Sequence, residues 1–219
     1  MRTVFHNSII RAGNAIVLID LKKKFCVKIL DPSFYKSVKL YFKFYKKQPQ
    51  EIKKYLPKPI SLFKNGNIYF YVERLIEGVK YVPTWENVFT MMKKVKDIIL
   101  SLSDEKGKGY INGNLTYGNI ILTKNGIKII DWIFLKKSYP LIDFLNFSES
   151  CYFYIFRDRK ISNRSLKFIE YVIYLVNRYS EELNLDKTHI KEIINEFLRS
   201  KSLYPSFQFR KILKNKMRL

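Results

Sequence analysis

Short apolar runs separated by turn signals fill the first third of the chain. Ile9–Asp20 has the pattern of two short strands around a turn that contains Gly13, and Phe25–Leu30 is a third apolar run. Two further runs, Ile60–Phe63 and Ile68–Val72, flank an Asn-Gly pair, which is typical of a β-hairpin. The pattern therefore predicts that the first part of the chain is rich in β-strands.

Apolar residues take a helical spacing in one segment of this first part and in most of the remainder. Phe34–Gln48 places the side chains of Val38, Tyr41, Phe42 and Tyr45 on one side of a helix. Later helices are expected at Glu86–Ser101, Pro140–Phe147, Ser165–Ser180 and Thr188–Ser200. We therefore expect an α+β chain of two lobes, with a β-rich lobe over residues 1–78 and a mainly helical lobe over residues 79–219.

Length and composition narrow the class of protein. A chain of 219 residues, 47% of them hydrophobic, can bury one sizeable core or two small ones. No apolar run approaches the roughly 20 residues that cross a bilayer, and the N-terminus lacks the apolar core of a secretory signal. Cys26 and Cys151 are too few for a disulfide framework or a zinc cluster. We expect a cytoplasmic protein in which Cys26 is a small buried hydrophobic residue.

The formal net charge of +22 favours anionic partners. Five lysines lie along one side of the predicted basic helix: Lys36, Lys39, Lys43, Lys46 and Lys47. The C-terminal tail from Phe197 also contains seven basic residues and no acid. These lysines and the tail are either solvated faces of a lysine-rich protein or docking surfaces for nucleic acid, a phosphorylated glycan, an acidic membrane surface or an acidic protein.

The chemistry is concentrated between residues 110 and 132. A polar loop ends in Asn119, a short apolar strand and an Asn-Gly turn follow, and a second apolar strand ends in Asp131. Such a hairpin places one amide oxygen and one carboxylate side by side at its mouth. Hard oxygen ligands of this kind suit Mg²⁺ attached to nucleotide phosphates. Asn114 stands in the loop where a catalytic base would be expected.

Two motifs in this region resemble the protein-kinase-like superfamily. Residues 112–119, NGNLTYGN, are similar to the family loop H-G-D-L-x-x-x-N, and residues 129–132, IIDW, to the strand that carries the metal-binding Asp. A family D-P-x-x-D follows as Tyr139-Pro140 through Asp143, so only its second Asp is retained. The nearest branch contains aminoglycoside phosphotransferases, choline kinases and lipopolysaccharide-core sugar kinases. The resemblance implies a two-lobed kinase-like fold that binds ATP and Mg²⁺.

The resemblance also implies roles for residues of the first lobe. Lys28 matches the strand lysine that meets the α- and β-phosphates, and Gly13 lies in the turn that covers the phosphates. Residues 73–78, which include Glu73 and Leu75, match the hinge that holds adenine through backbone groups. Asn119 and Asp131 match the Mg²⁺ ligands, and Asp143 is expected to anchor the loop backbone.

The chain departs from the family pattern in three ways. The base position of the loop is Asn114, no acid occurs between Asp31 and Glu51 to pair with Lys28, and the phosphate-covering turn has a single glycine. Two functions stay open. One is an ATP-dependent phosphotransferase that acts on a hydroxyl of a sugar, a glycolipid or another small polar molecule, with Asn114 orienting the acceptor. The other is a pseudokinase that binds nucleotide weakly or not at all and docks to an anionic partner.

Overall fold

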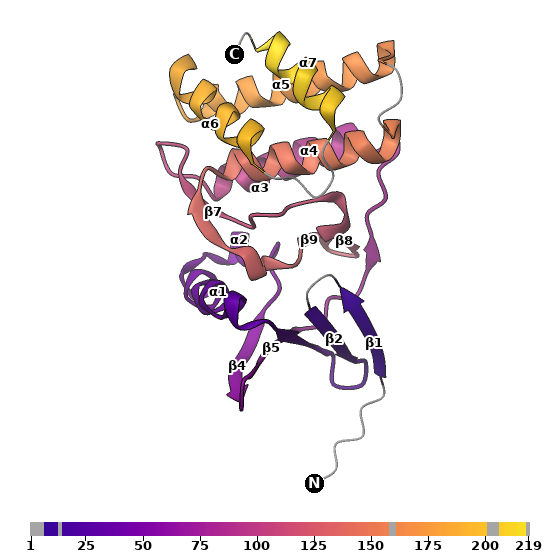
Figure 1. Ribbon diagram of the computed structural model, residues 1–219, viewed down its shortest axis with the longest axis vertical. Coiled ribbons are helices and arrows are strands. Elements are labelled where there is room, and N and C mark those ends of the chain that lie inside the picture. Colours follow the sequence, from indigo (N-terminus) through magenta and orange to yellow (C-terminus); the bar gives the residue numbers. More distant parts are fainter. Residues whose placement is uncertain (1–6, 13–14, 158–160, 201–205, 218–219) are drawn as a thin grey trace. The chain divides into compact units, whose positions relative to one another are not determined.

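The structure is a computed structural model that describes residues 7–12, 15–157, 161–200 and 206–217 (Figure 1). Its contacts divide the chain into two compact units. The first contains the described residues up to Lys80 together with Ile120–Leu135, and the second contains Tyr81–Asn119 and the described residues from Lys136 onward. The hairpin that follows Asn119 therefore packs with the N-terminal unit, whereas the lobe boundary near residue 78 stays a prediction.

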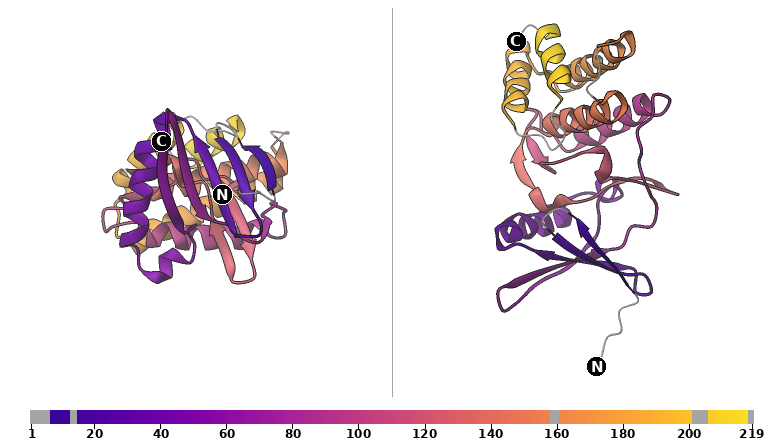
Figure 2. Two further views of the ribbon diagram at one scale, coloured as in Figure 1. Left: turned by 90° about the horizontal axis from the view of Figure 1, so that it is seen from below. Right: turned by 45° about the vertical axis from the view of Figure 1, so that its right-hand side comes forward.

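The first unit is built on an antiparallel sheet of five strands in the order β1-β2-β3-β5-β4, seen side by side in Figure 2. The strands are β1 (Asn7–Ala12), β2 (Ala15–Asp20), β3 (Phe25–Leu30), β4 (Pro59–Asn65) and β5 (Ile68–Arg74). In the β3–β5 ladder Lys28 pairs with Tyr71 and Cys26 with Glu73. Because alternate residues of a strand share a face, these four side chains lie on the same side of the sheet.

Helix α1 (Tyr35–Lys47) continues a short turn that begins at Asp31, whose carboxylate accepts a hydrogen bond from the Ser33 amide. The buried side chains of α1 are Val38, Tyr41 and Phe44. The predicted face included Phe42 and Tyr45, which are partly buried, and omitted Phe44. A short helix, α2 (Gln50–Lys53), follows α1 and had not been predicted.

A second sheet in the first unit has the order β6-β8-β9. Its strands are β6 (Val79–Lys80), β8 (Ile120–Thr123) and β9 (Gly126–Ile129). Gly78, directly before β6, lies so close to β8 that an added Cβ would collide with the Leu122 carbonyl oxygen. The connector between β5 and β6 can therefore approach the hairpin only because residue 78 has no side chain.

The second unit combines a two-stranded pairing with the larger helices. Its elements are α3 (Val88–Ser101), β7 (Gly109–Ile111), β10 (Lys136–Ser138), α4 (Pro140–Phe156), α5 (Asn163–Glu182), α6 (Lys187–Arg199) and α7 (Phe207–Lys216). Helix α4 continues nine residues past the predicted end at Phe147, because the polar residues 148–150 are buried and hydrogen-bonded within the unit. Among the described helices, none has the combined length and apolar character needed to cross a membrane.

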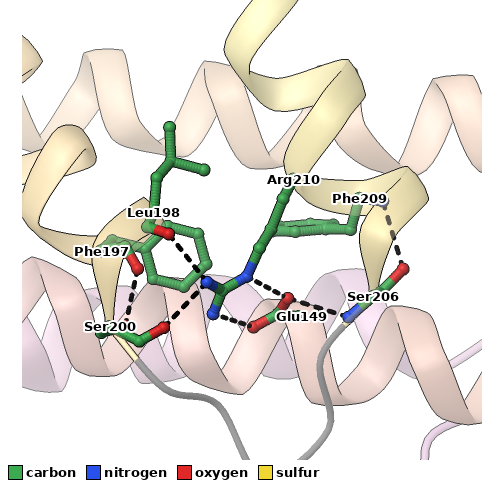
Figure 3. A network of polar contacts seen from close by, with 7 residues as sticks. All are labelled: Glu149, Phe197, Leu198, Ser200, Ser206, Phe209 and Arg210. Carbon is green, nitrogen blue, oxygen red and sulfur yellow. Dashed lines mark hydrogen bonds and ion pairs between the residues drawn. The ribbon is translucent and has the colours of Figure 1, made fainter.

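Helix α7 lies in the region predicted only as a basic tail. Its N-terminus is capped by Ser206, whose hydroxyl accepts from the Phe209 amide. Arg210 forms two hydrogen bonds to Glu149 of α4, at 2.7 and 3.0 Å, and also donates to two backbone carbonyls at the end of α6 (Figure 3). The Glu149 side chain is completely buried. This network ties the C-terminal helix to the core of the second unit.

Candidate functional site

Lys28 is a buried lysine in the middle of a sheet. It lies on β3, is only 6% exposed, and its ammonium group is 5.9 Å from the centre of the Tyr71 ring on β5. A lysine on an apolar strand usually extends its charged end to water. Because this ammonium stays inside, it needs compensating charges nearby.

Two carboxylates supply that compensation. The Lys28 Nζ atom lies 3.1 Å from Glu73 Oε1 and 3.3 Å from Asp131 Oδ1. Burial by itself lowers the pKa of Lys28, but the two carboxylates outweigh it and hold that pKa above the ordinary value. Lys28 is therefore charged at neutral pH. The structure brings Lys28 and Asp131 together within the first unit, while their roles toward a nucleotide stay predictions.

Asp131 is held in place by the tryptophan that follows it. Its backbone adopts a left-handed conformation, with φ 67° and ψ 50°, two residues after β9 ends at Ile129. Asp tolerates this region better than most residues, although the conformation still costs energy. The indole of Trp132 donates to the Ile129 carbonyl at 2.7 Å and stacks on the rings of Tyr41 and Phe44 of α1. The Asp-Trp pair thus fixes a carboxylate that remains 33% exposed.

The side chain of Glu73 has a contact that the sequence did not predict, while the hinge role of its backbone stays a prediction. The sequence assigned it only to the hinge, whereas its side chain is 6% exposed and takes the place of the acid expected from the helix after Lys28. Glu51, the first acid after the acid-free stretch that follows Asp31, is exposed on α2. Local sequence pattern does not predict this role, because the Lys28–Glu73 contact depends on the register of β3 against β5. The available signal was an acid two residues after Tyr71 on an apolar strand.

The remaining predictions for the first unit concern Leu75, Gly13 and Cys26. The Leu75 amide donates to the Lys24 carbonyl at 3.0 Å, so this amide already extends the pairing between the strands. Gly13 lies outside the described residues. Cys26 is buried, and burial, together with the nearby Glu73 carboxylate, raises the pKa of its thiol to about 12. The thiol is therefore protonated and unreactive at neutral pH, in line with its predicted packing role.

In the second unit, Asp143 organises the polar loop. Its carboxylate, on the first turn of α4, accepts hydrogen bonds from the backbone amides of Asn112 and Gly113. Burial raises the pKa of Asp143 to about 7, against the opposing effect of the backbone donors. The predicted anchoring of the loop by Asp143 is confirmed.

Asn114 and Asn119 occupy different settings in that loop. The Asn114 amide N–H donates to the Asn112 side chain at 3.3 Å, and Asn114 is partly exposed. The Asn119 side-chain oxygen accepts from the Thr116 amide at 3.0 Å and from the Thr116 hydroxyl at 2.8 Å. An amide oxygen has two lone pairs, so both are already used. The predicted convergence of Asn119 with Lys28 and Asp131 stays a prediction, as does the role of Asn114 toward an acceptor.

Comparisons with known proteins identify the fold. No protein-family model matches the sequence, and no curated protein sequence matches it significantly. An amicoumacin kinase, hAmiN, solved with AMP-PNP and Ca²⁺, superposes with a TM-score of 0.58 at 11% identity, over 97% of this chain and 86% of that chain. An aminoglycoside-3'-phosphotransferase of type VIII gives a TM-score of 0.56 at 10% identity, over 88% and 93%. The chain has a protein-kinase-like fold. The predicted α+β class is confirmed.

A third solved structure of this kinase-like fold is an aminoglycoside phosphotransferase from Streptomyces rimosus in complex with ADP and streptomycin. It superposes with a TM-score of 0.53 at 12% identity, over 85% of this chain and 92% of that chain. At such identities the likeness concerns the fold alone.

The donor set of the first unit fits a metal that a nucleotide brings with it. Among the described residues, no group of three or more His, Cys, Asp or Glu side chains could hold a metal ion. Mg²⁺ commonly needs only one or two carboxylates, since phosphate oxygens and water complete its octahedral shell. Asp131 offers one partly exposed carboxylate beside a charged lysine. This arrangement can bind a metal–phosphate group, although it is no metal site on its own.

Proposed function

We propose that this protein binds ATP with Mg²⁺ and transfers the γ-phosphate to a hydroxyl group of a small polar acceptor, such as a sugar or a glycolipid. The observation that carries the proposal is the buried Lys28 ammonium between Glu73 and Asp131, in a chain with a kinase-like fold. Solved structures with this fold include phosphotransferases in complex with ADP or AMP-PNP, which supports a nucleotide as the ligand.

The charges of Lys28, Glu73 and Asp131, which we call the Lys28 cluster, indicate how the nucleotide would bind. One ammonium and two carboxylates leave a net charge of one negative unit beside the expected phosphates. A triphosphate alone would be repelled by that charge. A divalent cation reverses the sign and neutralises charge that develops on the phosphates. Lys28 would contact the phosphates and Asp131 would hold the metal, so we expect nucleotide binding to depend on metal.

Asn114 sets the expected rate. Its amide can orient an acceptor hydroxyl by a hydrogen bond, but it cannot take the proton of that hydroxyl at neutral pH. General-base assistance contributes roughly 10²–10⁴-fold where it operates. Phosphoryl transfer passes through a loose transition state, so positioning and charge neutralisation still accelerate it. We therefore infer a slow enzyme, in which Asp143 supports the loop that carries Asn114.

A thermal-shift titration tests nucleotide binding. Native protein with ATP and Mg²⁺ should unfold at a higher temperature, because a ligand at 100 times its Kd stabilises by about 2.7 kcal/mol. We expect no shift for native protein with ATP and EDTA. With ATP and Mg²⁺, Asp131→Ala should show no shift. Glu51→Ala, which removes an exposed acid of the same unit, should show the full shift under those conditions. An unchanged melting curve for the native protein with ATP and Mg²⁺ would refute the proposal.

A base-restoring variant tests turnover. Asn114→Asp should raise ATP hydrolysis, or transfer to an aminoglycoside or sugar panel, by about 10²-fold or more. Asn125→Asp is a matched control, since it makes the same substitution at an exposed turn outside this loop. If native protein and Asn114→Asp are equally inactive while both bind ATP, the enzyme proposal fails and nucleotide binding alone survives.

A second candidate function, a pseudokinase, is favoured by the state of Asn119. Its side-chain oxygen is engaged by Thr116, so it can ligate metal only after releasing those hydrogen bonds. Thr116→Val removes the hydroxyl donor and keeps the size of the side chain. For a metal-binding Asn119, this variant should show a larger Mg²⁺-dependent ATP shift than native protein. A reduced or unchanged shift would favour the pseudokinase, in which Asn119 serves only to close the loop.

A further inference from the structure

A cavity in the first unit lies apart from the Lys28 cluster. It has a volume of about 330 Å³ and is lined by residues of α2 and the segment after it, by the end of β5 with the connector that follows, and by the turn between β8 and β9. The connector contributes Leu75, Ile76 and Glu77, so the cavity adjoins the segment that the sequence matches to the adenine-binding hinge. Neither Lys28, Glu73 nor Asp131 lines it. The volume is at the lower end of the range for small-molecule sites, roughly 300–1,000 Å³.

The charge of this cavity is almost entirely of one sign. Its basic lining residues are Lys53, Lys54, Lys58, Arg74, Lys124 and Lys128. Glu77 is the only acid in the lining, and its carboxylate is already paired with Lys24 at 2.8 Å. In the part of the chain that the structure describes, none of the six basic side chains forms an ion pair. A concave surface lined by several cations concentrates their electrostatic field and attracts an incoming anion.

Two of these cations are held in place by backbone and ring contacts. Lys128 is partly buried, and its Nζ donates to the Leu56 carbonyl at 3.3 Å. Burial lowers the pKa of Lys128, so a bound anion would be favourable there. Lys53 donates to the Lys46 carbonyl at 3.4 Å and lies 5.6 Å from the centre of the Tyr45 ring. Carbonyl and ring contacts orient an ammonium without cancelling its charge.

Apolar groups complete the lining. Tyr45, Leu56 and Pro57 contribute, and Leu56 and Pro57 are buried. A simple inorganic anion would leave this apolar surface uncovered. A small organic molecule with a ring or short carbon skeleton could cover it and present its anionic groups to the lysines.

We propose that this cavity binds a small organic phosphate with two or more phosphate groups, at a second site separate from the Lys28 cluster. The number of cations exceeds what one phosphate monoester can neutralise, since such a group carries about two negative charges at neutral pH. The cavity is concave and of small-molecule size, which favours a metabolite over an extended polymer. The proposal does not depend on whether the Lys28 cluster binds ATP.

Isothermal titration calorimetry with fructose 1,6-bisphosphate in EDTA tests this site, since metal-free conditions disfavour the Lys28 cluster. Lys54→Gln/Lys124→Gln removes two exposed cations of the cavity. Lys36→Gln/Lys39→Gln removes the same charge from the exposed side of α1, outside the cavity. We expect one binding site in native protein, with affinity about tenfold weaker in the cavity variant and changed less than about twofold in the α1 variant.

Three results would overturn the proposal. Native protein that binds no fructose 1,6-bisphosphate at physiological salt has no such site. Equal weakening by the cavity and α1 variants would show attraction by net charge only. Unchanged affinity in the cavity variant would place the bound molecule elsewhere. Circular dichroism of both variants checks that each remains folded.

Discussion

Replacement of Glu73 by Gln tests the charge arrangement around Lys28 most directly. Glu73→Gln keeps the size of the side chain and one hydrogen-bond acceptor, and removes only the charge. Lys28, 6% exposed, would then keep Asp131 as its single carboxylate partner. Loss of one member of a buried ion pair costs about 3–5 kcal/mol. Because Asp131 and the new amide oxygen remain, we expect a loss of about 1–3 kcal/mol in the free energy of unfolding.

A double-mutant cycle separates the pair from its surroundings. Lys28→Met alone leaves the Glu73 carboxylate buried without its cation, so it should destabilise by a similar amount. The double variant Lys28→Met/Glu73→Gln has no buried charge at either position and should lose little more than one single variant. We expect an interaction free energy of about 1–3 kcal/mol between the two residues. Urea unfolding followed by tryptophan fluorescence gives each value, since Trp132 contacts α1 in this unit.

Glu51→Gln is the matched control, because it removes the same charge from an exposed position of the first unit. Surface substitutions usually change stability by less than about 0.5 kcal/mol. If Glu73→Gln is no more destabilising than Glu51→Gln, or if the interaction free energy with Lys28 is below about 0.5 kcal/mol, Glu73 is not the partner that holds the lysine. The absence of an acid from helix α1 would then not be explained by Glu73.

Two further outcomes concern the second unit. Burial raises the folded-state pKa of Asp143 to about 7, above its ordinary value near 4, so the free energy of unfolding should fall as the pH rises from about 4 to 7. Urea unfolding of Asp143→Asn should lack this fall, and an equal fall in the variant would contradict the assignment to Asp143. Arg210→Met should destabilise by about 3–5 kcal/mol, because it leaves the buried Glu149 without its guanidinium. Lys216→Met, which breaks the exposed pair with Glu170, should change urea stability by less than about 0.5 kcal/mol, and equal losses would refute the role of Arg210.

Local sequence pattern was enough to find the strand that carries Lys28. Phe25–Leu30 was predicted with the bounds that the structure gives, because an apolar run interrupted only by Lys28 ends at an Asp-Pro pair. The hairpin before Asp131 followed from its Asn-Gly turn in the same way. Each of these elements is specified by its own residues. The resemblance of the loop and hairpin motifs to a known family then indicated Lys28, Asn119 and Asp131 as candidate site residues.

The contacts that the sequence did not disclose depend on residues distant along the chain. The predicted helix ended at Phe147, before the polar residues 148–150, but Glu149 is paired with Arg210, 61 residues later. The sequence predicts a basic tail where helix α7 lies, although Phe209, Ile212 and Leu213 give this helix a buried face. Both regions are rich in polar or basic residues, and such residues are usually exposed to solvent. Burial of such residues is stable only with a partner, and the partner is set by the tertiary fold.

The position of Glu73 changes what can control this kinase-like unit. In protein kinases the acid that pairs with the strand lysine comes from a helix, so movement of that helix makes or breaks the pair. Here Lys28 and Glu73 lie on adjacent strands of one sheet, and the pair is independent of where α1 lies. Helix α1 instead contacts Trp132 by stacking, directly after Asp131. A displacement of α1 would therefore leave the lysine charged and paired, and would act on the expected metal ligand, Asp131.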